Sequence, residues 1–269
     1  MADVLGGFTA APFTAGDITH DVYRAGTGPA VVVIAEIPGI TPKVAAFARR
    51  VMDLGCSVAL PHLFGTPGRA PSAAYAAQSL LHVCVSKEFC CLALGQIGPV
   101  SDWLRALARS EHVRGGGPGI GVVGMCFTGN YALAMAVDDI VIAPVLSQPS
   151  LPFPFGGPRK ADPAVSHADL TTIRARTEGD GTRILGLRFT GDRTCPAGRF
   201  QRLRDELGDR FVSVELDSSK GNPFGHPATA HSVLTEHLDD RDGTPTRAAV
   251  DQVLALFKNR LLPAEQTGT

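Results

Sequence analysis

A run of apolar residues and glycines at positions 119–131, GIGVVGMCFTGNY, constrains the fold of this chain more than any other stretch. Residues 120–123 form the continuous apolar run of a buried parallel strand, and residues 131–137 are typical of a helix. Cys126 therefore lies on a strand-to-helix turn, between Gly124 and Gly129. Glycine is expected at both positions, because a side chain there would collide with the neighbouring strand or helix.

A cysteine in this position is well placed to act as a nucleophile. The first amides of the following helix and the positive end of its dipole lie beside the sulfur, and both favour the thiolate, the reactive form of the thiol. The layout is that of a nucleophile elbow with Cys126 in place of serine. A cysteine between glycines also occurs in turns without chemistry, so a catalytic interpretation needs partners elsewhere in the chain.

The rest of the sequence alternates strand-like and helix-like segments, which is the pattern of an α/β fold. Residues 18–25 alternate as in an edge strand. The other predicted strands cover residues 30–35, 57–60, 140–145, 182–189 and 211–216, and the predicted helices cover residues 42–54, 100–108, 168–176, 197–207 and 246–262, with a helix or lid at 75–94. We therefore predict one domain over residues 1–269, in which a mostly parallel central sheet is flanked by helices on both faces and residues 1–17 form an N-terminal extension.

Composition argues against several classes of protein. A formal net charge of -1 gives no electrostatic support for nucleic acid or an anionic membrane as partner, so a small-molecule substrate is expected. The sequence has no apolar run of about 20 residues and no signal-peptide pattern at its start, which predicts a cytoplasmic protein. The 6 cysteines lack ligand spacing, so we expect free thiols and no metal site. We expect a monomer or a small homo-oligomer, although the residues themselves do not give the oligomeric state.

Polar residues follow three of the predicted strands. Glu36 comes after the first buried strand, Asp192 after a late one, and both His226 and His231 after the last. Because the carboxyl ends of parallel strands meet at one edge of a sheet, these side chains are expected near Cys126. Nucleophile, acid and histidine in this chain order form the triad of α/β-hydrolases, in which the histidine moves a proton and the acid orients its ring. For Glu36 a helix-capping or solvated carboxylate is an equal alternative.

Taken together, these motifs resemble the dienelactone hydrolases, also called carboxymethylenebutenolidases. The resemblance covers most of the chain, from about residue 31 to the last predicted helix. It rests on EIPGI at residues 36–40, GMCFTG at 124–129, GD at 191–192 and HS at 231–232. A glutamate combined with a cysteine elbow is more specific than either feature alone, because ester hydrolases of this fold mostly use serine.

The resemblance implies an α/β-hydrolase fold and a cofactor-free hydrolase of a small lactone or carboxylic ester. Cys126 would be the nucleophile and would form an acyl-enzyme, with His231 and Asp192 completing the triad. Glu36 would hold the thiol in the resting enzyme and would take its proton when substrate displaces the pair.

The resemblance also implies an oxyanion hole made by the backbone N–H groups of Ile37 and Phe127. The arginines that bind the lactone carboxylate in the family have no clear counterpart in this sequence. Arg69, Arg188 and Arg193 are the candidates for this role.

The sequence departs from the family pattern at the histidine. The family places Gly-His-Ser after the last strand, whereas here a glycine precedes His226 and a serine follows His231. We favour His231, because His-Ser followed by an apolar residue matches more of the motif and Pro227 stiffens the chain beside His226. His226 stays the alternative catalytic histidine.

Two functions from different classes fit these residues. The first is a thiol-dependent ester or lactone hydrolase. The second is a hydrolase-like protein without turnover, which uses Cys126 for ligand binding or redox sensing. The acid behind the histidine and the glutamate favour the first, because a sensor needs the thiol but neither of these groups.

Overall fold

The computed structural model describes residues 3–85, 98–154 and 156–264. Its strands are β1 (Thr9–Ala15), β2 (Ile18–Ala25), β3 (Ala30–Ile34), β4 (Ser57–Pro61), β5 (Ile120–Met125), β6 (Val141–Ser147), β7 (Ile184–Phe189) and β8 (Phe211–Leu216). Its helices are α1 (Pro42–Met52), α2 (Ala73–Val85), α4 (Pro99–Gly115), α5 (Gly129–Met135), α6 (Gly157–Ala161), α7 (His167–Asp180), α8 (Ala197–Leu207) and α9 (Pro245–Leu261), with short 3-10 turns η2 (Cys126–Thr128) and η3 (Gly208–Arg210).

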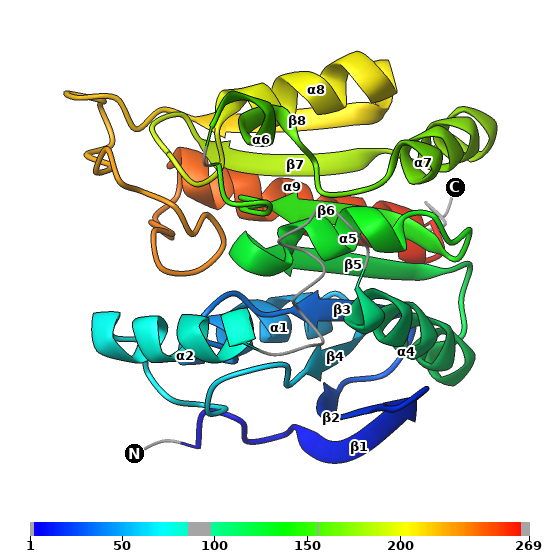
Figure 1. Cartoon of the computed structure of the whole chain (residues 1–269). Coiled ribbons are helices and arrows are strands. Elements are labelled where there is room, and N and C mark those ends of the chain that lie inside the picture. Colours follow the sequence, from blue (N-terminus) through cyan, green and yellow to red (C-terminus); the bar gives the residue numbers. More distant parts are fainter. Residues whose placement is uncertain (1–2, 86–97, 155, 265–269) are drawn as a thin grey trace, which may run out of the picture.

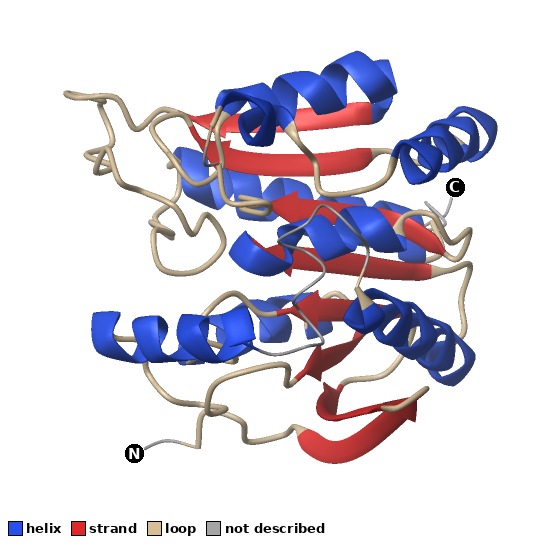
Figure 2. Ribbon diagram, viewed as in Figure 1, coloured by secondary structure: helices blue, strands red, loops and turns tan. Residues whose placement is uncertain are grey.

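All the strands above form a single sheet in the order β1-β2-β4-β3-β5-β6-β7-β8 (Figure 1). Strands β3 to β8 pair in parallel, whereas β2 pairs antiparallel with both β4 and β1. Helices lie in front of the sheet and behind it (Figure 2). The predicted mostly parallel sheet with helices on both faces is therefore confirmed.

Alternation of side chains along each strand divides the apolar core between the two faces. Val31 and Val33 of β3 pack in a cluster with α1 and α9, while Val32 and Ile34 pack in a cluster with α4 and α5. All four side chains are fully buried. A parallel strand covered on both faces has to be apolar along its whole length, which explains the continuous apolar runs in the sequence.

The N-terminal residues differ from the prediction. Residues 9–15 are not a mere extension but form β1, which pairs along its whole length with β2. Strand β1 is therefore the edge strand, and β2, predicted to be the edge, lies inside the sheet. Pro12 in the middle of this segment hides the strand signal, because proline is tolerated in a strand only at an edge or bulge.

Two predicted helices have different limits in the structure. Helix α4 continues to Gly115, beyond the predicted end at residue 108, because its last turns are mostly polar and carry no apolar period that the sequence could show. The predicted segment 75–94 becomes α2 up to Val85, and residues 86–94 lie outside the described part of the chain. No helix in the described ranges combines the length and apolarity needed to span a bilayer.

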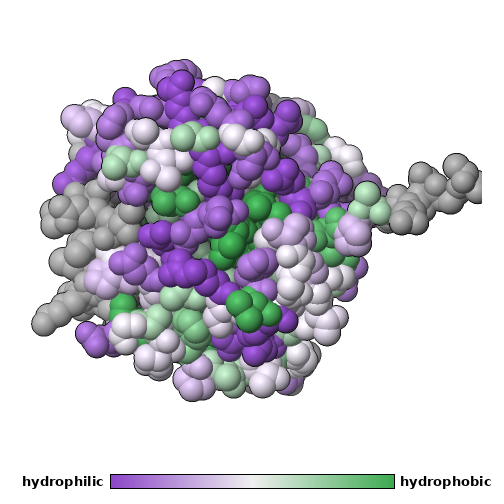
Figure 3. All heavy atoms as spheres, turned by 90° about the vertical axis from the view of Figure 1, so that its right-hand side faces the viewer, coloured by the Kyte–Doolittle hydropathy of each residue, from purple (hydrophilic) through white to green (hydrophobic). Residues whose placement is uncertain are grey.

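The two ends of the parallel strands are covered differently. Residues 217–244, between β8 and α9, contain no helix or strand and lie at the carboxyl ends of the strands, on the left of Figure 1. The opposite end, seen in Figure 3, has a mostly hydrophilic surface with small apolar areas. The predicted site residues lie at the end covered by residues 217–244, because they follow β3, β5 and β7 in the chain.

Candidate active site

The predicted strand-to-helix turn is present, and its geometry explains its glycines. Strand β5 ends at Met125, and Cys126 adopts φ 55°, a left-handed conformation that few non-glycine residues take. A Cβ atom on Gly124 would lie 2.2 Å from the carbonyl oxygen of Thr128, and one on Gly129 would lie 2.7 Å from Pro149 Cα. Both positions therefore require glycine for steric reasons.

Thr128 joins the turn to the neighbouring strand. Its fully buried hydroxyl accepts a hydrogen bond from the Met125 N–H at 2.9 Å and lies 2.9 Å from the carbonyl oxygen of Ile34. Strands β3 and β5 pair Ile34 with Gly124, so Ile37 and Phe127 each lie three residues beyond this pair. The two residues predicted to form the oxyanion hole thus belong to adjacent chain segments that Thr128 connects.

His231 and Asp192 contact each other across 39 residues of sequence. The Nδ1 atom of His231 lies 2.6 Å from Oδ2 of Asp192. The other carboxylate oxygen accepts hydrogen bonds from the hydroxyl and N–H of Thr194, at 2.7 and 2.9 Å, and from the N–H of Cys195 at 3.2 Å. Burial opposes ionisation of Asp192, but the bonds from His231 and Thr194 outweigh it and lower its pKa.

The electrostatic surroundings of His231 favour its protonated form. Burial alone would lower the pKa of His231, but the neighbouring Cys126 and Asp192 raise it well above 6.5. An imidazolium between a sulfur and a carboxylate can stabilise a thiolate and can later donate a proton to a leaving group. The three predicted residues are therefore electrostatically coupled.

Glu36 makes different contacts from those expected. Its carboxylate is buried and accepts hydrogen bonds from the hydroxyls of Ser232, at 2.6 Å, and Thr235, and from the side-chain amide of Gln148 at 3.3 Å. Within the described ranges, no hydrogen bond joins Glu36 to Cys126. Burial raises the pKa of Glu36, although the two hydroxyls oppose this effect. In this structure Glu36 holds the segment that carries His231.

His226, the alternative histidine, does not contact Asp192. Its ring packs edge-on against Phe189, with centroids 5.1 Å apart, and stacks on Phe224. Its Nε2 atom is buried without a hydrogen-bond partner among the described residues. The structure therefore brings His231, and not His226, to the predicted acid.

The three candidate arginines have different surroundings. Arg188 is only 2% exposed, and it forms an ion pair with Glu215 and donates to the carbonyl oxygens of Cys195 and Thr190 at 2.9 and 3.0 Å. The prediction that Arg188 binds substrate is therefore wrong, because its guanidinium already bonds to these buried partners.

The other two candidates lie nearer the surface. The Arg69 guanidinium stacks over the ring of Tyr75, 4.1 Å from its centroid. Arg193 is exposed and lines the same pocket as Cys126. Of the three arginines, only Arg193 is therefore at the predicted site.

Two pockets meet at His231. One, of about 410 Å³, is lined by Cys126, Asp192 and His231 together with Phe153 and Arg193. The other, of about 330 Å³, is also lined by His231 and includes Glu36, Ser232 and His237. The first pocket is the candidate acyl-binding site because it contains the sulfur.

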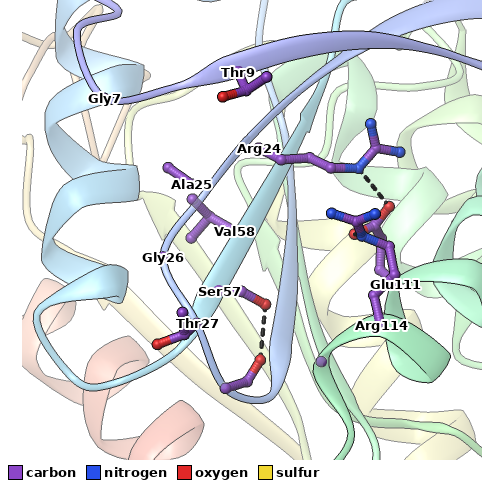
Figure 4. Close-up of a pocket in the computed structure, with 12 residues that line it drawn as sticks. Gly7, Thr9, Arg24, Ala25, Gly26, Thr27, Ser57, Val58, Glu111 and Arg114 are labelled. Atoms are coloured by element: carbon purple, nitrogen blue, oxygen red, sulfur yellow. Dashed lines mark hydrogen bonds and ion pairs between the residues drawn. The ribbon is translucent and has the colours of Figure 1, made fainter.

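A third cavity, of about 490 Å³, lies beside β2 and the end of α4 (Figure 4). Its charged side chains are paired with each other: Arg24 lies 2.8 Å and Arg114 lies 3.4 Å from the carboxylate of Glu111. None of the residues predicted for the site lines it. This cavity is therefore separate from the candidate active site.

Comparisons with known proteins identify the family of this chain and similar folds. A family model described as the dienelactone hydrolase family matches residues 20–259. The chain belongs to the dienelactone hydrolase family. The resemblance inferred from the sequence is thereby confirmed, and the fold is that of the α/β-hydrolases.

Solved structures of this fold are similar over nearly the whole chain. A putative dienelactone hydrolase from Klebsiella pneumoniae has a TM-score of 0.61 at 17% identity, with 93% of this chain and 98% of that one covered. A dienelactone hydrolase-like promiscuous phosphotriesterase from metagenomic libraries has a TM-score of 0.59 at 17% identity, with 95% and 100% covered. A dienelactone hydrolase from Anabaena variabilis has a TM-score of 0.56 at 14% identity, with 94% and 98% covered. No significant match is found among curated proteins.

Several residues at the site of this dienelactone hydrolase family member were not predicted. Glu36 was singled out because it is a polar residue at the carboxyl end of a strand. Gln148 directly follows β6, so the same rule applied to it. Thr128 is a polar residue in an apolar turn, which was also a usable signal. Thr235 and His237 gave no signal, because their roles depend on partners that the fold brings close.

Proposed function

We propose that this protein is a thiol-dependent hydrolase of small carboxylic esters or lactones, in which Cys126, His231 and Asp192 act together without a cofactor. One observation carries the proposal: the sulfur, the imidazole and the carboxylate line one pocket, with His231 Nδ1 2.6 Å from Asp192. Membership of the dienelactone hydrolase family supports it.

The proposed reaction has two stages. The Cys126 thiolate attacks the carbonyl carbon, and the N–H groups of Ile37 and Phe127 stabilise the oxyanion that forms. The intermediate collapses to a thioester when the bond to the leaving alcohol breaks and that oxygen takes a proton from His231. A water molecule, deprotonated by His231, then attacks the thioester, and the carboxylic acid leaves while the sulfur regains its electron pair.

The role of Glu36 as holder of the thiol stays a prediction. The carboxylate is occupied by Ser232, Thr235 and Gln148, and it would have to leave some of these bonds to reach Cys126. The bonds that it makes here support a second role, in which Glu36 keeps His231 in place through the chain that follows it.

The features of the pocket around Cys126 favour a substrate with a small, negatively charged acyl group. A volume of about 410 Å³ limits the size of the group, and Phe153 supplies an apolar wall. No ion pair of Arg193 is present among the described residues, so its guanidinium is available to a substrate carboxylate.

The test is hydrolysis of p-nitrophenyl acetate and of a panel of small lactones. Cys126→Ala should lower kcat/KM by at least about 10³-fold while the circular dichroism spectrum stays unchanged, because a triad without its nucleophile keeps only residual catalysis. His231→Ala should accumulate the acyl-enzyme, seen by mass spectrometry as an added acyl mass on Cys126.

Steady turnover by Cys126→Ala would contradict the proposal. A wild-type protein that is acylated once, or oxidised to a sulfenic acid, and does not turn over would support ligand binding or redox sensing instead. His226→Ala is the matched control for His231→Ala, because it removes a neighbouring histidine that does not contact Asp192.

A further inference from the structure

The ring of His237 makes hydrogen bonds to backbone groups that lie five and six residues earlier in the chain. Its Nδ1 atom accepts hydrogen bonds from the N–H groups of His231 and Ser232, both at 3.2 Å. Its own N–H donates to the carbonyl oxygen of Ser232 at 2.9 Å. Residues 231–237, which we call the histidine segment, thus close on themselves around one imidazole.

These bonds identify the tautomer of the neutral His237 ring. A nitrogen that accepts two N–H bonds carries no proton, so the neutral ring has its proton on Nε2. The ring also packs edge-on against Phe189, with centroids 6.1 Å apart and the planes at 72°. Phe189 ends β7, and the turn after it carries Asp192. His237 therefore contacts both His231 and the strand that precedes its acid.

We propose that His237 is a positioning residue for His231, which it holds in reach of Cys126 only while its own ring is neutral. Protonation of Nδ1 would set an N–H against the N–H groups of His231 and Ser232, and both bonds would be lost. The histidine segment would then depend on Glu36, which accepts from Ser232 and Thr235. The inference rests on the proposed function of His231 as the proton carrier.

The charged groups around His237 come from three parts of the chain. His231 and Glu236 belong to the histidine segment, Lys43 comes from α1, and His226 comes from the preceding loop. Burial, followed by His231, lowers the pKa of His237, while Glu236 opposes the shift. A lowered pKa means that the neutral ring is the form the fold favours. The bonds to the segment therefore persist at neutral pH and are lost as the pH falls through the lowered pKa.

The experiment compares three variants of the full chain. His237→Asn keeps an acceptor where Nδ1 was but cannot be protonated, whereas His237→Ala removes the acceptor. His112→Asn, in α4 at the other end of the sheet, is the control. The readouts are kcat and KM for p-nitrophenyl acetate and the rate of Cys126 alkylation by iodoacetamide, each from pH 5 to 8.

At pH 7.5, His237→Ala should lower kcat by about 10- to 100-fold, with a smaller effect on KM, because a displaced imidazole transfers protons poorly. His237→Asn should recover most of kcat and should lose less activity than the wild type toward pH 5. His112→Asn should behave like the wild type throughout. Ring 15N NMR should show His237 of the wild type with its proton on Nε2.

Two results would overturn the inference. One is a His237→Ala variant, folded by circular dichroism, with wild-type kcat and alkylation rate. The other is a ring proton on Nδ1 in the NMR spectrum at pH 7.5. Alkylation of Cys126 needs no ester substrate. It therefore tests the positioning role of His237 independently of the proposed hydrolase activity. A wild type without ester turnover whose alkylation rate still responds to His237→Ala would refute the proposed function and leave this inference standing.

Discussion

At the scale of single residues, steric contacts within the turn around Cys126 decide its shape. Gly124 faces the carbonyl group of Thr128, and Cys126 between them has a left-handed backbone. A rigid turn of this kind keeps the sulfur at the end of β5. Strain in the backbone at this point is held by the packing of the strand and the helix on both sides.

Gly124→Ala should therefore destabilise the protein by about 1–3 kcal/mol and abolish ester hydrolysis, because its Cβ would lie 2.2 Å from the Thr128 oxygen. Gly179→Ala is the matched control: it lies in α7 with no atom within 4 Å of the new Cβ, so a gain of about 0.5–1 kcal/mol is expected. Urea unfolding curves measure both. A Gly124→Ala protein with normal stability and activity would contradict the steric argument.

At the scale of elements, β7 and the turn after it carry two kinds of side chain: buried ones in the strand and ones that line the candidate site in the turn. Arg188 points into the protein toward Glu215, whereas Asp192 and Arg193, beyond the end of the strand, reach the pocket of Cys126. The side chains change from buried to pocket-lining within a few residues, because they alternate between the two faces of the sheet in the strand but not in the turn.

The two arginines should give opposite results when they are changed. Arg188→Met should lower the free energy of unfolding by about 2–4 kcal/mol, because it leaves buried acceptors without donors, and should leave KM unchanged. Arg193→Ala should leave stability unchanged and raise KM about tenfold for an ester with an acyl carboxylate but not for its neutral analogue. If Arg193→Ala changed both esters equally, Arg193 would not be a carboxylate ligand.

At the scale of the whole molecule, the bond between His231 and Asp192 joins the turn after β7 to the long connection between β8 and α9. This contact links stability to pH through both partners. Asp192, with its pKa lowered from 3.8, stabilises the fold above that value and loses this effect as the pH falls. His231, with its pKa raised, stabilises the fold below 6.5 and loses this effect as the pH rises through the raised pKa.

The stability difference between the wild type and Asp192→Asn should accordingly be largest between pH 3.8 and 6.5 and should shrink toward pH 9. Urea unfolding at several pH values measures this difference. A difference that has already disappeared by pH 7 would mean that His231 is neutral in the folded protein at that pH, contrary to its raised pKa.

The sequence by itself determined the parallel sheet, the turn at Cys126 and the order of the polar residues at the strand ends. These features follow from local rules: apolar runs of strand length, glycines where a side chain cannot fit, and helices with a 3.6-residue period. Glu36, Asp192 and the histidines could be singled out because strand ends are visible in the pattern of apolar runs.

Only the tertiary structure decided which residues meet. Local patterns around His226 and His231 are nearly equivalent, and the choice between them depends on a 2.6 Å contact with a residue 39 positions away. The partners of Glu36, the burial of Arg188 and the pairing of β1 with β2 likewise depend on packing between separate segments. The physical reason is that the energy of these contacts comes from burial and hydrogen bonds across the fold, which no short stretch of sequence records.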